Sequence, residues 1–128
     1  MAKRSAPRPS DGELAILRVL WQRGPCTVRG VHEALNPAQP TGYTTTLKLM
    51  QIMLDKGLVT RDESDRAHVY RAALSRKRTL RRLAADLVDR AFGGSAEELV
   101  VHALEGRKVT PDELERIRKL LDELGEDR

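Results

Sequence analysis

The sequence has little of what a disulfide-bonded, metal-binding or membrane-spanning protein needs. Its single cysteine, Cys26, excludes an intrachain disulfide and any metal site that requires two thiolates. We interpret Cys26 as a buried structural thiol, with a redox sensor as the alternative. No apolar run approaches the roughly 20 residues that cross a bilayer, and the basic residues 1–10 lack the apolar stretch of a signal peptide. We therefore expect a cytoplasmic protein.

Aromatic residues are also scarce. They make up 3% of the 128 residues, against 40% hydrophobic and 33% charged residues, so a core must consist mainly of Leu, Val, Ile, Met and Ala. This composition favours helices, and the length suits one domain or a compact head with a short arm.

The sequence lacks the patterns that indicate catalysis. The histidines His32, His68 and His102 are far apart, and there is no His-x-x-x-His pair, glycine-rich phosphate loop or serine at a strand-to-helix elbow. We predict that the chain is not an enzyme and has no cofactor or metal. A metal-responsive switch is an alternative that would require these histidines to converge.

Charge is distributed unevenly along the chain. Residues 1–82 contain 16 Lys and Arg against 7 Asp and Glu, whereas residues 83–128 contain 7 against 12. The basic part suits a polyanion such as DNA, while the acidic, leucine-bearing tail suits contact with protein.

We expect residues 1–9 to form a flexible, basic leader. The first helix signals come directly after it. Ser10 and Glu13 form a capping box that predicts a helix ending at Gly24-Pro25. Its inner face contains Leu14, Leu17 and Trp21. Thr27 is positioned to cap a short second helix that ends at Asn36-Pro37. The inner face of this second helix contains Val28, Val31 and Leu35.

A third helix is predicted from about Tyr43 to Lys56, ending at Gly57. At 100° per residue it has an inner arc and an opposite polar arc. The inner arc contains Thr46, Leu47, Leu49, Met50, Met53 and Leu54, and the polar arc contains Thr44, Thr45, Lys48, Gln51 and Asp55. Ile52 is the exception, because it is apolar but falls away from the inner arc.

A hairpin is predicted directly after this helix. Residues 58–60 form one strand, residues 62–66 a charged turn, and residues 67–72 a returning strand, with His68 in a structural role at its base. Three helices followed by a hairpin are typical of a winged helix-turn-helix. We predict a mainly α-helical fold with a small β-hairpin, in which residues 10–74 form the DNA-binding head.

Residues 75–128 are predicted to form a helical dimerisation arm. Ser75 begins a helix that closes at Gly93-Gly94, Ser95 and Glu98 form a second capping box for a helix that ends at Gly106, and Thr110-Pro111 begins the last helix. A thin arm of this kind cannot bury its apolar stripes alone, so we expect a second subunit. The predicted dimerisation residues are Leu83, Leu87, Leu99, Leu114, Ile117, Leu121 and Leu124. The alternative is that the tail folds back on its own head.

The polar arc of the third helix carries groups suited to base edges. A lysine ammonium can donate to guanine, and a threonine offers a hydroxyl and a methyl group. The predicted base-reading residues are Tyr43, Thr44, Thr45 and Lys48. The predicted phosphate contacts are Thr27, Arg29, Arg61, Arg66, Arg76 and Arg78. When this helix is considered without its basic neighbours, the alternative is that its polar face is simply exposed to solvent.

Five segments together resemble the penicillinase repressor family, the BlaI/MecI/CopY-type winged-helix regulators. They are residues 14–21, 27–35, 42–48, 56–59 and the wing sequence 65–70. The resemblance implies a homodimer that binds a palindromic operator and represses antibiotic-resistance or stress genes.

The family also suggests two routes of induction. In antibiotic-responsive members, a membrane-associated metalloprotease sensor system leads to cleavage of an Asn-Phe bond in the tail, which aligns with His102–Ala103 here. This difference argues against cleavage by a similar protease. Copper-responsive members carry a C-terminal cysteine motif that this sequence lacks, so we do not expect copper sensing.

Two other functions remain as alternatives. One is a winged-helix module that binds an acidic protein, and the other is a nucleoid-type protein that binds DNA without operator preference. Alanine substitution of Thr44, Thr45 and Lys48 would test the first, and competition with random duplex would test the second.

Overall fold

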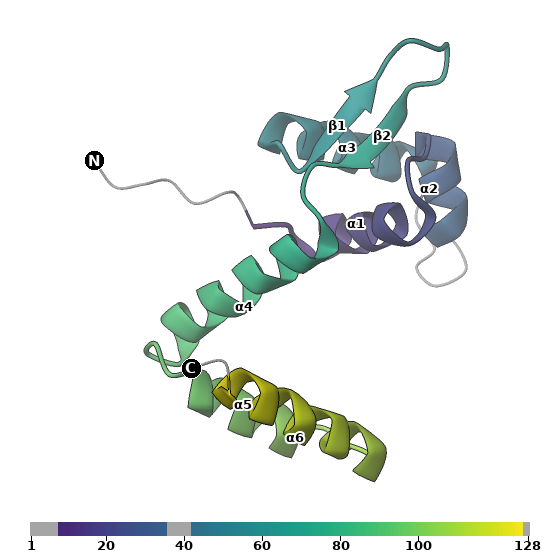
Figure 1. Cartoon of the computed structure of the whole chain (residues 1–128). Helices are drawn as coiled ribbons and strands as arrows, with labels where there is room; N and C mark the ends of the chain where they lie inside the picture. The colour runs from purple at the N-terminus through teal and green to yellow at the C-terminus, as the bar shows by residue number, and fades with distance from the viewer. Residues whose placement is uncertain (1–7, 36–41, 127–128) are drawn as a thin grey trace. The chain divides into compact units, whose positions relative to one another are not determined.

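The computed structural model describes residues 8–35 and 42–126, and the chain divides into two compact units, residues 1–83 and 84–128. The described residues are mainly α-helical with one antiparallel hairpin (Figure 1), as predicted. Most of the predicted leader, residues 1–9, and the predicted helix end at Asn36-Pro37 lie outside the described residues.

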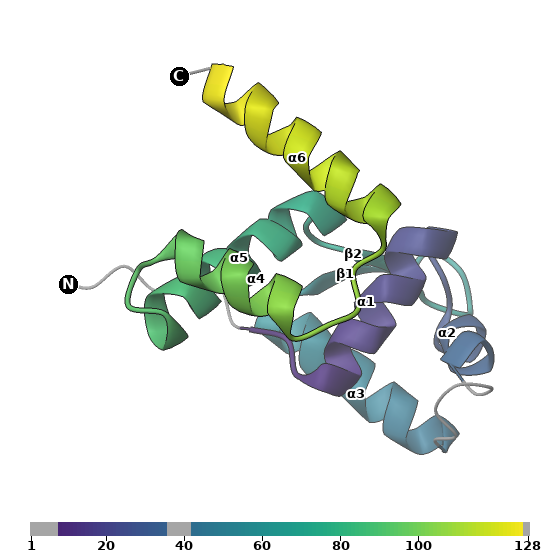
Figure 2. The same ribbon diagram turned by 90° about the horizontal axis from the view of Figure 1, so that it is seen from below.

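The core of the first unit is formed by helices α1 (Asp11–Arg23), α2 (Val28–Leu35) and α3 (Tyr43–Lys56), which pack against one another (Figure 2). The predicted caps are present: the Ser10 hydroxyl accepts from the Glu13 amide at 3.2 Å, and the Thr27 hydroxyl accepts from the Gly30 amide at 3.1 Å. The buried apolar side chains are Ile16, Leu17, Leu20, Val28, Val31, Met50, Met53, Val59 and Tyr70. Helices therefore supply most of the core, as the composition indicated.

The hairpin consists of β1 (Val59–Asp62) and β2 (Val69–Ala72), paired from Val59–Ala72 to Asp62–Val69. The predicted strand bounds, 58–60 and 67–72, were wrong at three of their four ends: the first strand begins one residue later and ends two residues later, and the second begins two residues later. The Asp62 carboxylate accepts hydrogen bonds from the Ser64 amide at 2.9 Å and the Ser64 hydroxyl at 2.7 Å. This side-chain turn begins at Asp62, which is also the last residue of β1, so the first strand continues through Arg61 and Asp62.

The hairpin is also bound to the loop between α1 and α2. The Cys26 amide donates to the Tyr70 carbonyl at 3.0 Å, and the Tyr70 amide donates to the Cys26 carbonyl at 2.7 Å. Tyr70 is buried, while the Cys26 thiol is half-buried and lies 3.3 Å from the Gly24 carbonyl oxygen. A single residue of that loop therefore pairs with β2 and holds the wing against the helices, an arrangement that the sequence patterns did not predict.

The remaining helices are α4 (Arg76–Ala91), α5 (Ala96–Glu105) and α6 (Pro111–Glu126). Ser75 and Thr110 cap α4 and α6 as predicted, each accepting a backbone amide at 3.1 Å. The second capping box is only half formed, because the Ser95 amide donates to the Phe92 carbonyl and is not available to Glu98. Across residues 8–35 and 42–126, no helix combines the length and apolar character needed to span a bilayer.

Candidate nucleic-acid interface

Helix α3 has one face in the core and one face in solvent. Thr46, Met50 and Met53 are at most 1% exposed, and Leu47, Leu49 and Leu54 pack against the core. The exposed residues of α3 are Tyr43, Thr44, Thr45, Lys48, Gln51, Ile52 and Asp55. The predicted polar arc is therefore on the outside, and Lys48 has no ion-pair partner within the described part of the chain.

A cluster of side chains from α2 and α3 surrounds Tyr43 at the start of α3. The His32 ring meets the Tyr43 ring edge-on, with centroids 5.7 Å apart, and the Arg29 guanidinium lies 5.4 Å from the centroid of the same ring. His32 Nδ1 is 3.4 Å from the hydroxyl of the buried Thr46. Tyr43 is 40% exposed, yet its ring is held in place. Sequence reasoning named Tyr43 and Arg29 but missed His32.

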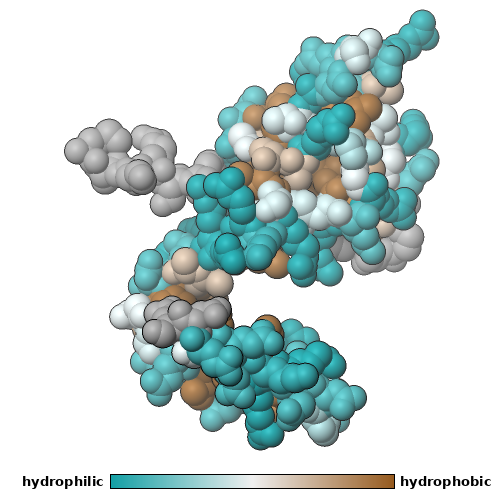
Figure 3. Space-filling view, in the orientation of Figure 1, coloured by the Kyte–Doolittle hydropathy of each residue, from teal (hydrophilic) through white to brown (hydrophobic). Residues whose placement is uncertain are grey.

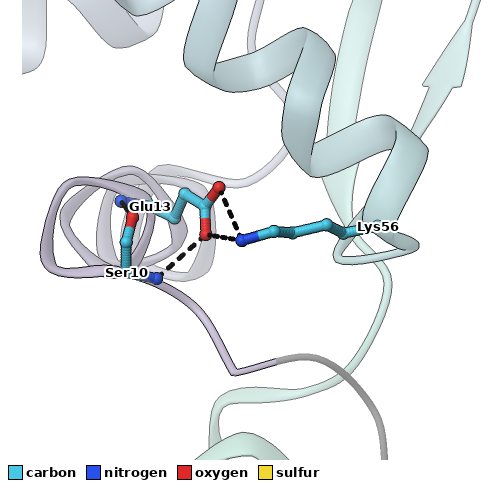
Figure 4. Close-up of polar contacts among 3 residues, drawn as sticks. All are labelled: Ser10, Glu13 and Lys56. Carbon is cyan, nitrogen blue, oxygen red and sulfur yellow. Dashed lines mark hydrogen bonds and ion pairs between the residues drawn. The ribbon is translucent and has the colours of Figure 1, made fainter.

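The opposite end of α3 is anchored to the start of α1 (Figure 4). Lys56 Nζ lies 2.8 Å and 3.1 Å from the two carboxylate oxygens of Glu13, and the Ser10 amide donates to the same carboxylate at 2.9 Å. Glu13 is 2% exposed. Burial raises the pKa of Glu13, but the Lys56 ammonium and the Ser10 hydrogen bonds outweigh it and hold the pKa below its ordinary value. The ion pair therefore fixes the end of the helix that carries the polar arc.

The two predicted wing arginines have different surroundings. Arg61 forms an ion pair with Glu63 and donates to the Tyr70 hydroxyl at 3.3 Å, and the Tyr70 and Glu63 hydrogen bonds raise the pKa of Arg61. Arg66 is exposed and has no ion-pair partner among the described residues. Arg66 is therefore the better placed of the two to contact an external anion.

The other predicted phosphate contacts lie on α2 and α4. Arg29, Arg76 and Arg78 are exposed. Thr27 is half-buried, and its hydroxyl accepts a hydrogen bond from the Gly30 amide, which leaves its O–H able to donate to a phosphate.

Apolar side chains remain exposed in the second unit. Among the predicted dimerisation residues of this unit, Leu87 is 46%, Leu121 54% and Leu124 61% exposed, and Leu99, Leu114 and Ile117 are half-buried. The remaining one, Leu83, is the last residue of the first unit and is also half-buried. Val100, Val101 and Leu120 are also exposed but were not predicted. On the face drawn in Figure 3, the second unit is mostly teal, with small brown areas where hydrophobic side chains reach the surface.

The predicted cleavage position lies within a regular helix. His102 and Ala103 are exposed in α5, and the His102 ring stacks on Phe92 with centroids 5.6 Å apart. Within the described residues, no group of three or more His, Cys, Asp or Glu side chains could hold a metal ion.

A family model described as "Penicillinase repressor" matches residues 9–123. The chain belongs to the penicillinase repressor family. The predicted resemblance is thereby confirmed, and so is the prediction that the chain is not an enzyme, because this family consists of transcriptional repressors.

Curated members of the family are similar over most of the chain. The transcriptional regulator BlaI of Mycobacterium tuberculosis is 37% identical over 119 residues, which cover 91% of this chain and 85% of the relative. The penicillinase repressor of Bacillus licheniformis is 20% identical over 117 residues, covering 91% of each. The chain is thus a BlaI-like transcriptional regulator.

Solved structures confirm the winged-helix fold. The DNA-binding domain of the repressor BlaI matches 58% of this chain and 90% of its own length with a TM-score of 0.51 and 20% identity. Bacillus licheniformis BlaI, solved as a monomeric form in complex with the blaP half-operator, matches 59% of this chain and 92% of its own, also with a TM-score of 0.51 and 20% identity.

Proposed function

We propose that the chain is a sequence-specific DNA-binding repressor that acts in the cytoplasm as a homodimer on a palindromic operator. The observation that carries the proposal is the exposed polar face of α3, supported from behind by the core and at its end by the Glu13–Lys56 ion pair. The similar BlaI structure in complex with a half-operator supports a role for the same fold in binding DNA. In this proposal, α3 lies in the major groove and the wing lies along the backbone.

Within the head, residues 10–74, the side chains divide into two roles. Lys48 donates to the O6 and N7 atoms of guanine, while Tyr43, Thr44 and Thr45 contact base edges from the first turn of α3. Within the described residues no side chain caps this helix, and in this proposal the amides of Tyr43 and Thr44 in its first turn donate to a phosphate. The exposed arginines contact phosphates and supply affinity with little sequence preference.

Residues 75–128 hold two subunits together in this proposal. No residue of α5 or α6 is buried within one chain, although both helices carry leucine and valine side chains. Burying those side chains against a second copy would remove apolar surface from water and align two heads with two half-sites, about one or a few turns of 10 bp apart.

The regulated genes in this proposal are antibiotic-resistance or stress genes, as the family suggests. A cut in the tail by a membrane-associated metalloprotease sensor system would separate the two heads, but His102–Ala103 in place of an Asn-Phe bond argues against a protease of the same specificity. Because His102 and Ala103 lie inside α5, a protease could cut between them only after that helix had unwound locally.

The experiment that tests the proposal compares two single substitutions in the full-length protein. A cognate duplex is first enriched from a random library, and binding to it is compared with binding to random duplex. Lys48→Ala should weaken binding to the cognate duplex by about 1–3 kcal/mol and barely affect random duplex. Arg66→Ala should weaken both to a similar extent and reduce the salt slope by about 1. Equal losses on both duplexes for Lys48→Ala would remove it from base reading, and failure to enrich any sequence would overturn sequence-specific binding.

A further inference from the structure

Ile52 is the apolar side chain of α3 that does not follow the pattern of its neighbours. The other aliphatic side chains of this helix belong to the core or pack against it, whereas Ile52 does neither and is 36% exposed. Single apolar side chains at a protein surface are common and need no explanation by themselves. What matters is therefore the position of Ile52 on the helix.

Ile52 lies within the exposed face of α3. It follows Lys48 by four residues and Thr45 by seven, and both spacings place side chains on the same side of an α-helix. Lys48, Thr45 and Ile52 are all exposed. The polar face of α3 therefore contains an apolar side chain one turn beyond Lys48, on the same side as two of the residues that we propose read bases.

We propose that Ile52 contacts the 5-methyl group of a thymine in the operator and selects for that base. The inference rests on the proposed function, because it requires α3 to lie in the major groove. Thymine presents a methyl group at its major-groove edge, and apolar side chains recognise thymine through that group. Cytosine presents an amino donor at the same edge, and Ile52 would desolvate that donor without accepting its hydrogen bond.

The first test removes only the methyl group from the DNA. Each thymine of the enriched cognate duplex is replaced in turn by deoxyuridine, and the affinity of the full-length protein is measured. Loss of one buried methyl contact should weaken binding about fourfold per half-site at the contacted position. A wild-type protein that is insensitive at every thymine would overturn the role of Ile52, even if the enriched sequence confirms specific binding. Failure to enrich a sequence would count against the proposed function itself.

The second test asks whether Ile52 is the residue that senses the methyl group. Ile52→Ala should lose the sensitivity to deoxyuridine at that thymine, while Gln51→Ala, a change at the exposed neighbouring position, should keep it. Ile52→Val provides a smaller change that should retain part of the sensitivity. If Ile52→Ala stays fourfold sensitive at the same thymine, another residue makes the contact. Because Ile52 lies outside the core cluster, circular dichroism should show that these variants remain folded.

Discussion

The Glu13–Lys56 ion pair allows an asymmetric prediction, because its partners are buried to different extents. Glu13 is 2% exposed, whereas the Lys56 side chain is 33% exposed. Removing Lys56 leaves a buried carboxylate with the Ser10 amide as its remaining donor. Removing the charge of Glu13 leaves the Lys56 ammonium, which water can still reach.

We therefore expect Lys56→Met to destabilise the protein more than Glu13→Gln. Breaking a fully buried pair costs about 3–5 kcal/mol, and the partial exposure of Lys56 reduces this to about 2–3 kcal/mol for Lys56→Met. Glutamine at position 13 can still accept from the Ser10 amide, so Glu13→Gln should cost about 1 kcal/mol.

The same pair predicts how the difference depends on pH. In the wild type the pKa of Glu13 is lowered from 4.5, so its contribution to stability is complete above about pH 4.5 and is lost as the pH falls through the folded-state pKa. In Lys56→Met the hydrogen bond and the positive charge of Lys56 no longer oppose the effect of burial, so the pKa of Glu13 should rise. Acidification from pH 7 towards 4.5 should then neutralise the carboxyl group and reduce the stability deficit of the variant.

Urea unfolding of the full chain, at one protomer concentration and at both pH values, measures these differences. The fluorescence of Trp21 is a suitable probe, since it is the single tryptophan and its indole donates to the Leu74 carbonyl at 3.0 Å. Lys56→Met with wild-type stability, or Glu13→Gln as the more damaging change, would refute the reasoning.

Two further predictions concern the tail and the helix ends. Ile117→Asp or Leu121→Asp should weaken self-association in sedimentation equilibrium by at least about 100-fold, because a carboxylate is costly in an apolar interface. Lys119→Asp should not, and dimers that persist in both tail variants would place the interface elsewhere. Gly57→Ala should cost about 1 kcal/mol in urea unfolding, since φ is 82° and an added Cβ meets nothing within 4 Å. Gly24→Ala should cost more, about 2–3 kcal/mol, because its φ of 88° with ψ of −167° is accessible almost only to glycine. The reverse order would contradict this account.

Sequence periodicity predicted the parts of the fold that repeat along the chain. The bounds of α3 agreed with its pattern because a continuous inner arc ends at a glycine in the left-handed conformation. The same pattern correctly placed Thr44, Thr45 and Lys48 in solvent. Local caps at Ser10, Thr27, Ser75 and Thr110 were predictable because each one involves residues close in sequence.

Contacts between distant residues left no periodic signal. Glu13 and Lys56 are far apart in the chain. From the sequence, Glu13 is explained as part of a capping box and Lys56 as a basic residue in the last turn of a helix, so neither suggests the other as its partner. The half-formed cap at Ser95 depends on the preceding turn, where the Phe92 carbonyl accepts the Ser95 amide. His32 was treated as an isolated histidine because its partners, Tyr43 and Thr46, lie on another helix.

The pairing of Cys26 with Tyr70 uses backbone atoms alone. Its two hydrogen bonds join amides to carbonyls, and the sulfur atom takes no part in them. Position 26 can therefore change its side chain to serine or alanine and keep the attachment of the wing. Reagents that consume thiols would alter the chemistry of this residue while the hairpin stays joined to the helices.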